Sequence, residues 1–194
     1  MGYYKHETAI VENDRVGDGT KIWHFVHVRS GARIGKNCTI GKGVYIDTEA
    51  VIGNKVKIQN FVSVYKGVII EDEVFVGPSV TFTNDRYPRA FQWGEEDLVK
   101  TIVHTGASIG ANATILCGIT IGHYAMVGAG SVVTKDVPDH GLVYGSPAKL
   151  QGYVCFCCRR LEEIISEDDE NIRFRCHHCG KTVEIKKCVL VSLD

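Results

Sequence analysis

The sequence predicts an all-β fold, a parallel β-helix built from hexapeptide repeats, and three observations lead to this prediction. An aliphatic or aromatic residue recurs every six positions through the first 82 residues. A second ladder of small and aliphatic residues follows it four positions later. Glycine is abundant, with 21 in 194 residues, as a chain that turns a corner every few residues requires. Because a period of six belongs neither to an α-helix nor to one long strand, each hexad should form one short strand and one corner. Three hexads should then close one triangular coil.

The first ladder divides the chain into two blocks of coils. In the first block its members are Ile10, Val16, Ile22, Val28, Ile34, Ile40, Ile46, Ile52, Ile58, Val64, Ile70, Val76 and Phe82. In the second block they are Val103, Ile109, Ile115, Ile121, Val127 and Val133. The second ladder comprises Val26, Ala32, Cys38, Val44, Ala50, Val56, Val62, Val68, Val74 and Val80. We expect both ladders to fill the interior of a prism. Glycine directly after the aliphatic residue, as at Gly35 and Gly53, is expected to supply a positive φ at the corner.

The repeat breaks between Phe82 and Val103, at a distance that is not a whole number of hexads. The expected loop, residues 84–101, begins Asn84-Asp85-Arg86-Tyr87-Pro88-Arg89. A long loop that interrupts a rigid scaffold is usually functional, and its polar and aromatic side chains favour that interpretation over a tolerated surface insertion. After the second block, Pro138 ends the coil and residues 138–152 are expected to cap it.

The composition changes after residue 152, which predicts a β-helix domain over 1–152 and a small domain over 153–194. The second part contains Cys176-His177-His178-Cys179-Gly180 and, upstream of it, Cys155-Phe156-Cys157-Cys158. Two such cysteine pairs predict a structural zinc ribbon, in which Zn²⁺ stabilises a segment too short to build a core. The spacing leaves open whether Cys157 or Cys158 is the second ligand.

Composition and charge exclude several classes of function. The net charge is −1, so no electrostatic footprint for nucleic acid or a membrane surface is expected. The N-terminus has no apolar signal-peptide region, and no apolar run is long enough to cross a bilayer. We therefore expect a cytoplasmic protein that neither inserts into a membrane nor binds nucleic acid.

Four segments carry a resemblance to a known family: residues 3–6, 22–27, 57–65 and 77–85. The Gln59-Asn60, Val64-Tyr65 and Phe82-Thr83-Asn84 pieces are far more specific than the hexads. The chain resembles the left-handed β-helix acyltransferases of the hexapeptide-repeat superfamily. Among them it is most similar to N-acetyltransferases that act on the 3-amino group of nucleotide-linked amino sugars. The left-handed coil is implied by this resemblance.

The resemblance also implies a reaction and an assembly. The expected activity is acetyl-CoA-dependent N-acetylation of UDP-2-acetamido-3-amino-2,3-dideoxyglucuronate for surface polysaccharide (lipopolysaccharide) biosynthesis. Relatives that share Thr-Asn-Asp-Arg-Tyr-Pro-Arg act on dTDP-3-amino-6-deoxyhexoses, so a dTDP-3-amino-3,6-dideoxyhexose is the alternative acceptor. The implied assembly is a homotrimer with active sites between subunits and coenzyme A along the second block.

Asn84 is the candidate for the reacting centre, because its amide lies where the coil opens into the loop and can orient the sugar amine. Asp85 can accept a proton, hold the amine or simply cap the turn. The loop contains no histidine, and the histidines considered as bases, His24, His27, His104 and His123, have structural or interface roles as alternatives. We expect positioning and carbonyl polarisation to dominate, with no strong base.

Further candidates surround this centre. The expected substrate-binding residues are His24, Gln59, Asn60, Tyr65, Arg86 and Arg89. The expected cofactor-binding residues are Gly106, Ala107, Ala125, Gly128, Lys135 and Lys149. Arginine suits a carboxylate or pyrophosphate, small residues expose backbone to a pantetheine arm, and lysines neutralise phosphates. Asn60 and other asparagines can instead simply satisfy hydrogen bonds at the corners. Lys135 and Lys149 can instead be surface lysines that contact only solvent.

The resemblance bears on the zinc ligands as well. Relatives whose tail begins similarly have Gly at the place of Cys158, followed by a Leu like Leu161. This favours Cys155, Cys157, Cys176 and Cys179 as the ligands, with Cys158 as the alternate to Cys157. Several relatives lack the full set, so the zinc is expected to be structural.

Two other functions compete with this interpretation. A γ-type carbonic anhydrase needs three histidines gathered across a trimer interface, including a close pair on one coil, which this sequence does not supply. A non-catalytic assembly module, with the ribbon as its docking site, would bind no coenzyme A and would tolerate Ala at Asn84.

Overall fold

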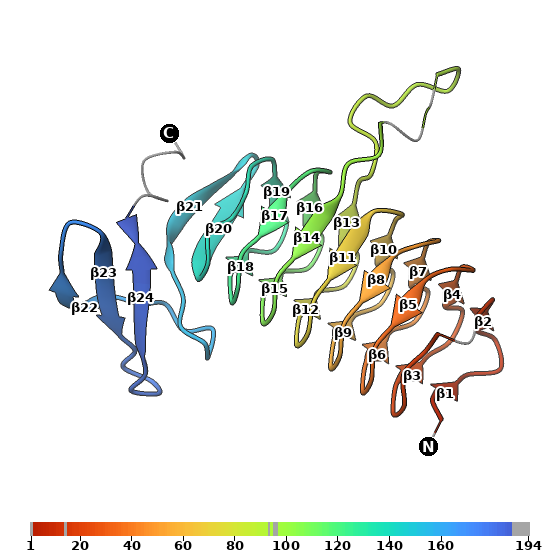
Figure 1. The fold of residues 1–194 in the computed structure, drawn as a ribbon, viewed down its shortest axis with the longest axis horizontal. Helices are drawn as coiled ribbons and strands as arrows, with labels where there is room; N and C mark the ends of the chain where they lie inside the picture. Colours follow the sequence, from red (N-terminus) through yellow and green to blue (C-terminus); the bar gives the residue numbers. More distant parts are fainter. Residues whose placement is uncertain (1, 14, 93, 95–96, 188–194) are drawn as a thin grey trace.

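The computed structural model describes residues 2–13, 15–92, 94 and 97–187. These residues form a parallel β-solenoid of triangular coils, followed by a small antiparallel sheet (Figure 1). The fold class predicted from the six-residue period is confirmed. No helix among the described residues combines the length and the apolar character needed to cross a membrane.

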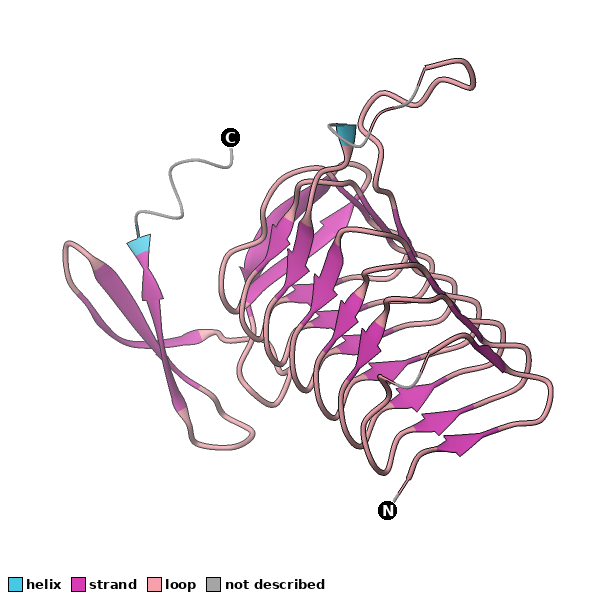
Figure 2. Ribbon diagram, turned by 45° about the vertical axis from the view of Figure 1, so that its right-hand side comes forward, coloured by secondary structure: helices cyan, strands magenta, loops and turns pink. Residues whose placement is uncertain are grey.

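Three sheets form the sides of the solenoid, parallel except for β21, and successive strands from β3 to β19 pass from one side to the next (Figure 2). Sheet A contains β1 (Tyr4–Lys5), β3 (Lys21–Ile22), β6 (Thr39–Ile40), β9 (Lys57–Ile58), β12 (Phe75–Val76), β15 (Ser108–Ile109), β18 (Met126–Val127), β20 (Gly141–Gly145) and β21 (Ala148–Tyr153). Sheet B contains β2 (Ile10–Val11), β4 (His27–Val28), β7 (Tyr45–Ile46), β10 (Ser63–Val64), β13 (Thr81–Phe82), β16 (Thr114–Ile115) and β19 (Val132–Val133). Sheet C contains β5 (Arg33–Ile34), β8 (Val51–Ile52), β11 (Val68–Ile70), β14 (Thr101–Val103) and β17 (Thr120–Ile121). The corners between them define three edges of the prism, here called A–B, B–C and C–A.

The two ladders fill the interior. From Ile22 onward, every member of the first ladder is at most 4% exposed, and every member of the second ladder is at most 1% exposed. Paired residues in neighbouring coils are 18 positions apart, as in the pairing of Arg33 with Val51. The prediction is wrong at Ile10, which is 57% exposed. Val11 pairs with Val28 and Ile10 with His27, so the first coil is one residue short and its side chains exchange faces.

The glycines after the aliphatic residues have another role than the expected one. Positive φ occurs two residues later, at Asn37 and Lys55 for example, and not at Gly35 or Gly53. A Cβ on Gly35 would lie 2.4 Å from the carbonyl oxygen of Gly53 in the next coil. Glycine is therefore needed there because the corners stack too closely for a side chain.

The break in the repeat is an excursion from the B–C edge. Across it, Val68 pairs with Thr101 and Phe82 with Ile115, at a separation of 33 residues in place of 18. The loop thus adds 15 residues while sheets B and C continue in register. It returns on itself through antiparallel bridges between Asp85 and Leu98 and between Arg89 and Gln92. It projects from the solenoid between β13 and β14 (Figure 1).

The C-terminal end of the solenoid is closed by a hairpin. Strand β20 pairs in parallel with β18, and β21 folds back antiparallel on β20. Beyond it, sheet D consists of β22 (Glu163–Glu167), β23 (Asn171–Arg175) and β24 (Thr182–Lys186). This sheet has its own hydrophobic cluster, which comprises Tyr153, Cys155, Leu161, Phe174, Cys176, Val183 and Ile185.

Candidate functional site

Asn84 and Asp85 lie half-buried at the base of the loop, on the B–C edge. The carboxylate Oδ1 of Asp85 accepts a hydrogen bond of 2.8 Å from the backbone N–H of Tyr87. Asp85 therefore stabilises the turn, as its alternative interpretation held. The Asn84 carboxamide forms no hydrogen bond with another described residue, so it is free to meet a ligand.

The two arginines of the loop line one hollow. It has a volume of about 460 Å³, and its other lining residues are Tyr87, Pro88, Gln92 and Asp97. Arg86 also reaches the next coil, because its Nη2 lies 3.4 Å from where a Cβ on Gly118 would stand. Both guanidinium groups are thus available to an anionic group held at the loop.

The other substrate candidates are divided between two edges. Tyr65 is on the B–C edge one coil below the loop, since Ser63 pairs with Thr81 and Tyr65 lies below Thr83. Asn60, however, is on the A–B edge, where its Oδ1 accepts a hydrogen bond of 2.9 Å from the backbone N–H of Lys42. It satisfies a corner, as the alternative interpretation held. Gln59 and His24 share that edge, and His24 stacks on His6 with ring centroids 3.5 Å apart. One chain alone does not bring these three residues to Asn84.

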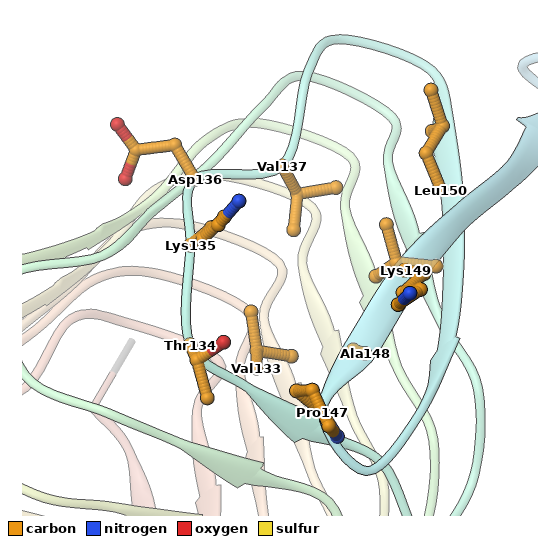
Figure 3. A pocket seen from close by; sticks show the side chains of 10 residues that line it. Val133, Thr134, Lys135, Asp136, Val137, Pro147, Ala148, Lys149 and Leu150 are labelled. Atoms are coloured by element: carbon orange, nitrogen blue, oxygen red, sulfur yellow. The ribbon is translucent and has the colours of Figure 1, made fainter. Parts of the chain in front are cut away.

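Lys135, in the last corner of the second block, lies close to Lys149, in the expected capping region. Both line a pocket of about 210 Å³ at the end of the solenoid, between the corner at 134–136 and the β20–β21 hairpin (Figure 3). Its apolar wall includes Val133, Val143 and Leu150. The pocket is on the same edge as the loop and two coils above it, which is roughly 10 Å at the spacing of neighbouring strands.

The small residues expected to line the cofactor are not at this pocket. Ala107 and Ala125 are fully buried in the interior, and with Gly106 they belong to the C–A edge. A Cβ on Gly106 would stand 2.4 Å from the ring of Tyr124, which stacks against His140 and meets Phe156. Gly128 is on the A–B edge, beneath the Cβ of Tyr144. Within this chain, the Tyr124 ring lies over Gly106 and Tyr144 of β20 lies over Gly128. Cofactor binding at these four residues stays a prediction.

None of the four candidate histidines lies on the B–C edge in this chain. His27 faces outward from sheet B, with its Nε2 2.6 Å from Oε1 of Glu12. His104 and His123 lie on the C–A edge, with ring centroids 4.5 Å apart. Whether acetyl transfer needs a base therefore stays a prediction.

Four cysteines of the C-terminal segment converge. The Sγ atoms of Cys155, Cys157, Cys176 and Cys179 all lie within 4.8 Å of one another. Cys155 and Cys179 are 3.4 Å apart at Sγ, and Cys157 and Cys176 are 3.7 Å apart. Tetrahedral Zn–S bonds of about 2.3 Å place sulfurs roughly 3.8 Å apart, so the four side chains fit Zn²⁺. Cys158 is outside the cluster, with its Sγ 3.8 Å from Oγ of Ser108.

The thiols of this cluster have strongly different acidities. The backbone N–H of Cys179, helped by that of His178, lowers the pKa of Cys176 to about 6. Burial raises the pKa of Cys155 to about 12. One thiolate is thus available at neutral pH to begin metal binding, and the metal would displace the protons of the others.

Sequence reasoning missed one cluster altogether. Glu71, His104 and His123 place a carboxylate oxygen and two imidazole nitrogens within 4.8 Å of one another on the C–A edge. Residues in neighbouring coils are normally 18 positions apart, but the loop between Glu71 and His104 increases this separation to 33. The sequence alone therefore did not show that the two residues are neighbours. Their proximity depends on the register across that loop.

Comparison with known proteins adds three findings. The model of the family described as bacterial transferase hexapeptide (six repeats) matches residues 15–48, 49–84 and 100–135. The chain is 50% identical over 161 residues to dTDP-3-amino-3,6-dideoxy-alpha-D-galactopyranose 3-N-acetyltransferase of Aneurinibacillus thermoaerophilus, covering 83% of each chain. It is 39% identical over 131 residues to serine acetyltransferase 4 of Arabidopsis thaliana, covering 66% of this chain and 30% of that one.

Among solved structures, the fold is similar to that of a GDP-perosamine N-acetyl transferase variant from Caulobacter crescentus, crystallised with CoA and GDP-perosamine. The TM-score is 0.58 at 24% identity, and the match covers 78% of this chain and 57% of that one. At this identity the likeness bears on the fold.

Proposed function

The chain belongs to the bacterial transferase hexapeptide family, and from that premise we propose that this acyltransferase is an amino-sugar N-acetyltransferase. It transfers the acetyl group of acetyl-CoA to the 3-amino group of a nucleotide-linked sugar. The observation that carries the proposal is the 50% identity, over 83% of both chains, to an enzyme named for this reaction on a dTDP-linked sugar. A dTDP-3-amino-3,6-dideoxyhexose is therefore the better supported acceptor, and the UDP-linked glucuronate stays a prediction.

The B–C edge supplies the groups that the reaction needs. We assign to the Asn84 amide the positioning of the sugar amine, beside the turn that Asp85 holds. Arg86 and Arg89 suit the pyrophosphate of the nucleotide, and the phenol of Tyr65 suits a sugar hydroxyl. The amine nitrogen attacks the thioester carbon, the C–N bond forms, the C–S bond breaks, and the thiolate of coenzyme A takes the proton from nitrogen. A neutral amine needs no separate base for this sequence.

The pocket between Lys135 and Lys149 is the proposed site for the phosphates of coenzyme A. From there the pantetheine arm would follow the B–C edge past the corner at 116–118 to Asn84. Thr83 stabilises that corner, because its Oγ1 accepts a hydrogen bond of 3.0 Å from the backbone N–H of Cys117. This path differs from the one expected along Gly106, Ala107, Ala125 and Gly128.

A homotrimer would complete the site. His24, Gln59 and Asn60 lie on the A–B edge, which also exposes Phe25 and Phe61. We propose that a neighbouring subunit presents this edge to the loop, so that each active site lies between two chains. The enzyme would act in the cytoplasm, on a sugar destined for a surface polysaccharide.

The cysteine cluster is the proposed site of a structural Zn²⁺. Four sulfurs at tetrahedral distances leave no open coordination position, which is typical of structural sites. Bound there, the metal would contribute to the folding of sheet D and would take no part in acetyl transfer.

The test of the function is a panel of nucleotide-linked 3-amino sugars assayed with acetyl-CoA, following release of free thiol. We expect turnover with the dTDP-3-amino-3,6-dideoxyhexoses to exceed that with the UDP-linked 2-acetamido-3-amino glucuronate. Thiol release with no 3-amino sugar, or with serine alone, would overturn the proposal.

Asn84→Ala should lower kcat/KM on the best acceptor by about 100-fold, because a misplaced amine loses the alignment on which the reaction depends. Circular dichroism should show an unchanged fold. Asn13→Ala, in the first coil, is the matched control and should keep full activity. Full activity in Asn84→Ala would contradict the assignment of that residue.

A further inference from the structure

Three successive coils place Glu71, His104 and His123 at one corner of the prism. Ile70 pairs with Val103, and Val103 with Ile121, so Glu71 and His104 are neighbours and His123 lies in the coil above. This corner is on the C–A edge, whereas Asn84 is on the B–C edge. The cluster therefore lies outside the proposed acetyl-transfer site.

Glu71 is held in an orientation that suits a ligand. Its Oε2 accepts hydrogen bonds from the backbone N–H and the hydroxyl of Thr105, at 3.0 Å and 3.1 Å. These two hydrogen bonds fix the orientation of the carboxylate. Its other oxygen, Oε1, lies 3.0 Å from Nδ1 of His104.

His104 has a buried nitrogen without a well-oriented partner. Its Nδ1 is 3.0 Å from Oε1 of Glu71, within ion-pair range. The angle does not suit an N–H···O bond, and the same atom is buried without a hydrogen bond to any described residue. A metal ion between the two atoms would satisfy both.

His123 is fixed by an outer carboxylate. Its Nδ1 lies 3.1 Å from Oδ1 of Asp139, which also accepts a hydrogen bond of 2.7 Å from the backbone N–H of His123. Histidines that bind metals commonly donate their second ring N–H to a carboxylate in this way. The arrangement leaves Nε2 of His123 for a ligand.

We propose that Glu71, His104 and His123 bind a divalent transition metal ion such as Zn²⁺, at a second site distinct from the cysteine cluster. Two imidazoles and one carboxylate are a donor set that binds Zn²⁺ and leaves a coordination position open. Both histidines line a cavity of about 800 Å³ that extends to Glu184 and Lys186 on β24, which gives room for water or an anion at that position. The metal would link three coils beside the junction with sheet D.

Cobalt distinguishes the two sites in the full-length protein. After one equivalent of Zn²⁺ per chain has filled the cysteine cluster and unbound Zn²⁺ has been removed, added Co²⁺ should bind at one further equivalent per chain. Its visible absorption should lack the intense thiolate-to-cobalt charge-transfer bands.

The side chain of His123 is 46% exposed, so the His123→Ala variant should fold normally and bind Co²⁺ at least 10-fold more weakly. Asp139→Asn should weaken Co²⁺ binding about 10-fold through the lost outer contact.

His27→Ala is the matched control, because His27 also lies against a carboxylate but has no second imidazole beside it in sheet B. It should bind Co²⁺ as the parent does. The proposal is overturned if no Co²⁺ binds beyond the cysteine cluster. It is equally overturned if His104→Ala and His123→Ala both bind Co²⁺ with the affinity of the parent.

Discussion

The side chain of His140 contacts both the end of the solenoid and the cysteine-rich segment. It is 8% exposed, and its Nδ1 lies 2.9 Å from the carbonyl oxygen of Val154. Its ring stacks on Tyr124 and meets the edge of Phe156 at a centroid distance of 4.7 Å. Burial lowers the pKa of His140 below its ordinary value of 6.5.

This burial predicts a loss of stability on mild acidification. Below pH 6.5 the unfolded chain binds a proton at His140, while the folded chain does so only at lower pH. The free energy of unfolding therefore falls as the pH drops below about 6.5. The Tm should therefore be lower at pH 5.5 than at pH 7.5.

His140→Asn tests the assignment by differential scanning fluorimetry. Asparagine tolerates the positive φ of 59° at this position and does not titrate. The variant should be less stable at pH 7.5 but should lose less Tm on acidification than the parent. An identical pH dependence in both proteins would place the titrating group elsewhere.

Residue types were easier to predict from sequence than residue contacts. The sequence shows amides at Asn60 and Asn84, but only the structure shows one bound to a corner N–H and the other without a described partner. It shows small residues at Gly106 and Ala107, but not the Tyr124 ring that covers them. Contacts of this kind depend on which coil follows which, and the hexad pattern is silent on the outward-facing positions.

At the scale of single strands, each rung of the solenoid has an inward and an outward residue. In β9 Ile58 is fully buried, and Lys57 beside it is exposed. Both pair in register with β6 and β12, so they share the same backbone environment. A substitution at Lys57 is therefore a matched control for a substitution at Ile58 when the contribution of the core to stability is measured.

Ile58→Ala should lower the free energy of unfolding by about 2–5 kcal/mol, because the solenoid interior cannot collapse around the missing methylenes. Lys57→Ala should change it by less than about 0.5 kcal/mol. Urea unfolding followed by circular dichroism measures both. Equal effects of the two substitutions would contradict the assignment of inward and outward faces.

Strands were predictable wherever the period of six held and not elsewhere. The ladders predicted the rungs of sheets A, B and C from Ile22 to Val133, because burial of one residue per rung leaves a mark in the sequence. The period failed at β2, where a coil one residue short reversed the faces. It gives no information on β21–β24, whose antiparallel pairing does not repeat with the coil.

Over the whole molecule, the described residues form two hydrophobic clusters, one within the solenoid and one around sheet D. The second is small; Cys155 and Cys176 belong to it, and Cys157 packs against it. A segment of this size gains much of its stability from a metal when it has one. Loss of the proposed Zn²⁺ should therefore unfold sheet D and leave the solenoid folded.

Cys179→Ser should remove the thiolate-bound Zn²⁺ and make the segment after residue 155 sensitive to trypsin, with a solenoid fragment as the stable product. Metal analysis and limited proteolysis measure the two effects. Cys158→Ser is the control, since Cys158 lies outside the sulfur cluster. Retention of zinc and of protease resistance in Cys179→Ser would exclude a metal at these four cysteines.

The architecture as a whole was predictable, and the site was predictable only in its position along the chain. The failure of the period after Phe82 located the loop, because an insertion is visible wherever a repeat is strict. The division of the candidate residues among three edges was not visible. It follows from the number of residues per coil, which decides the edge on which each outward-facing residue lies.

The 15-residue excursion has a consequence for how such enzymes diversify. Sheets B and C stay in register across it, so the length of the loop does not enter the pairing of the coils. Lengthening a flexible loop also costs little free energy, about 0.6 kcal/mol for each doubling. Residues 84–100 can therefore be replaced by the loop of a relative without redesign of the core beneath. Under the proposed function, such a graft should change acceptor preference.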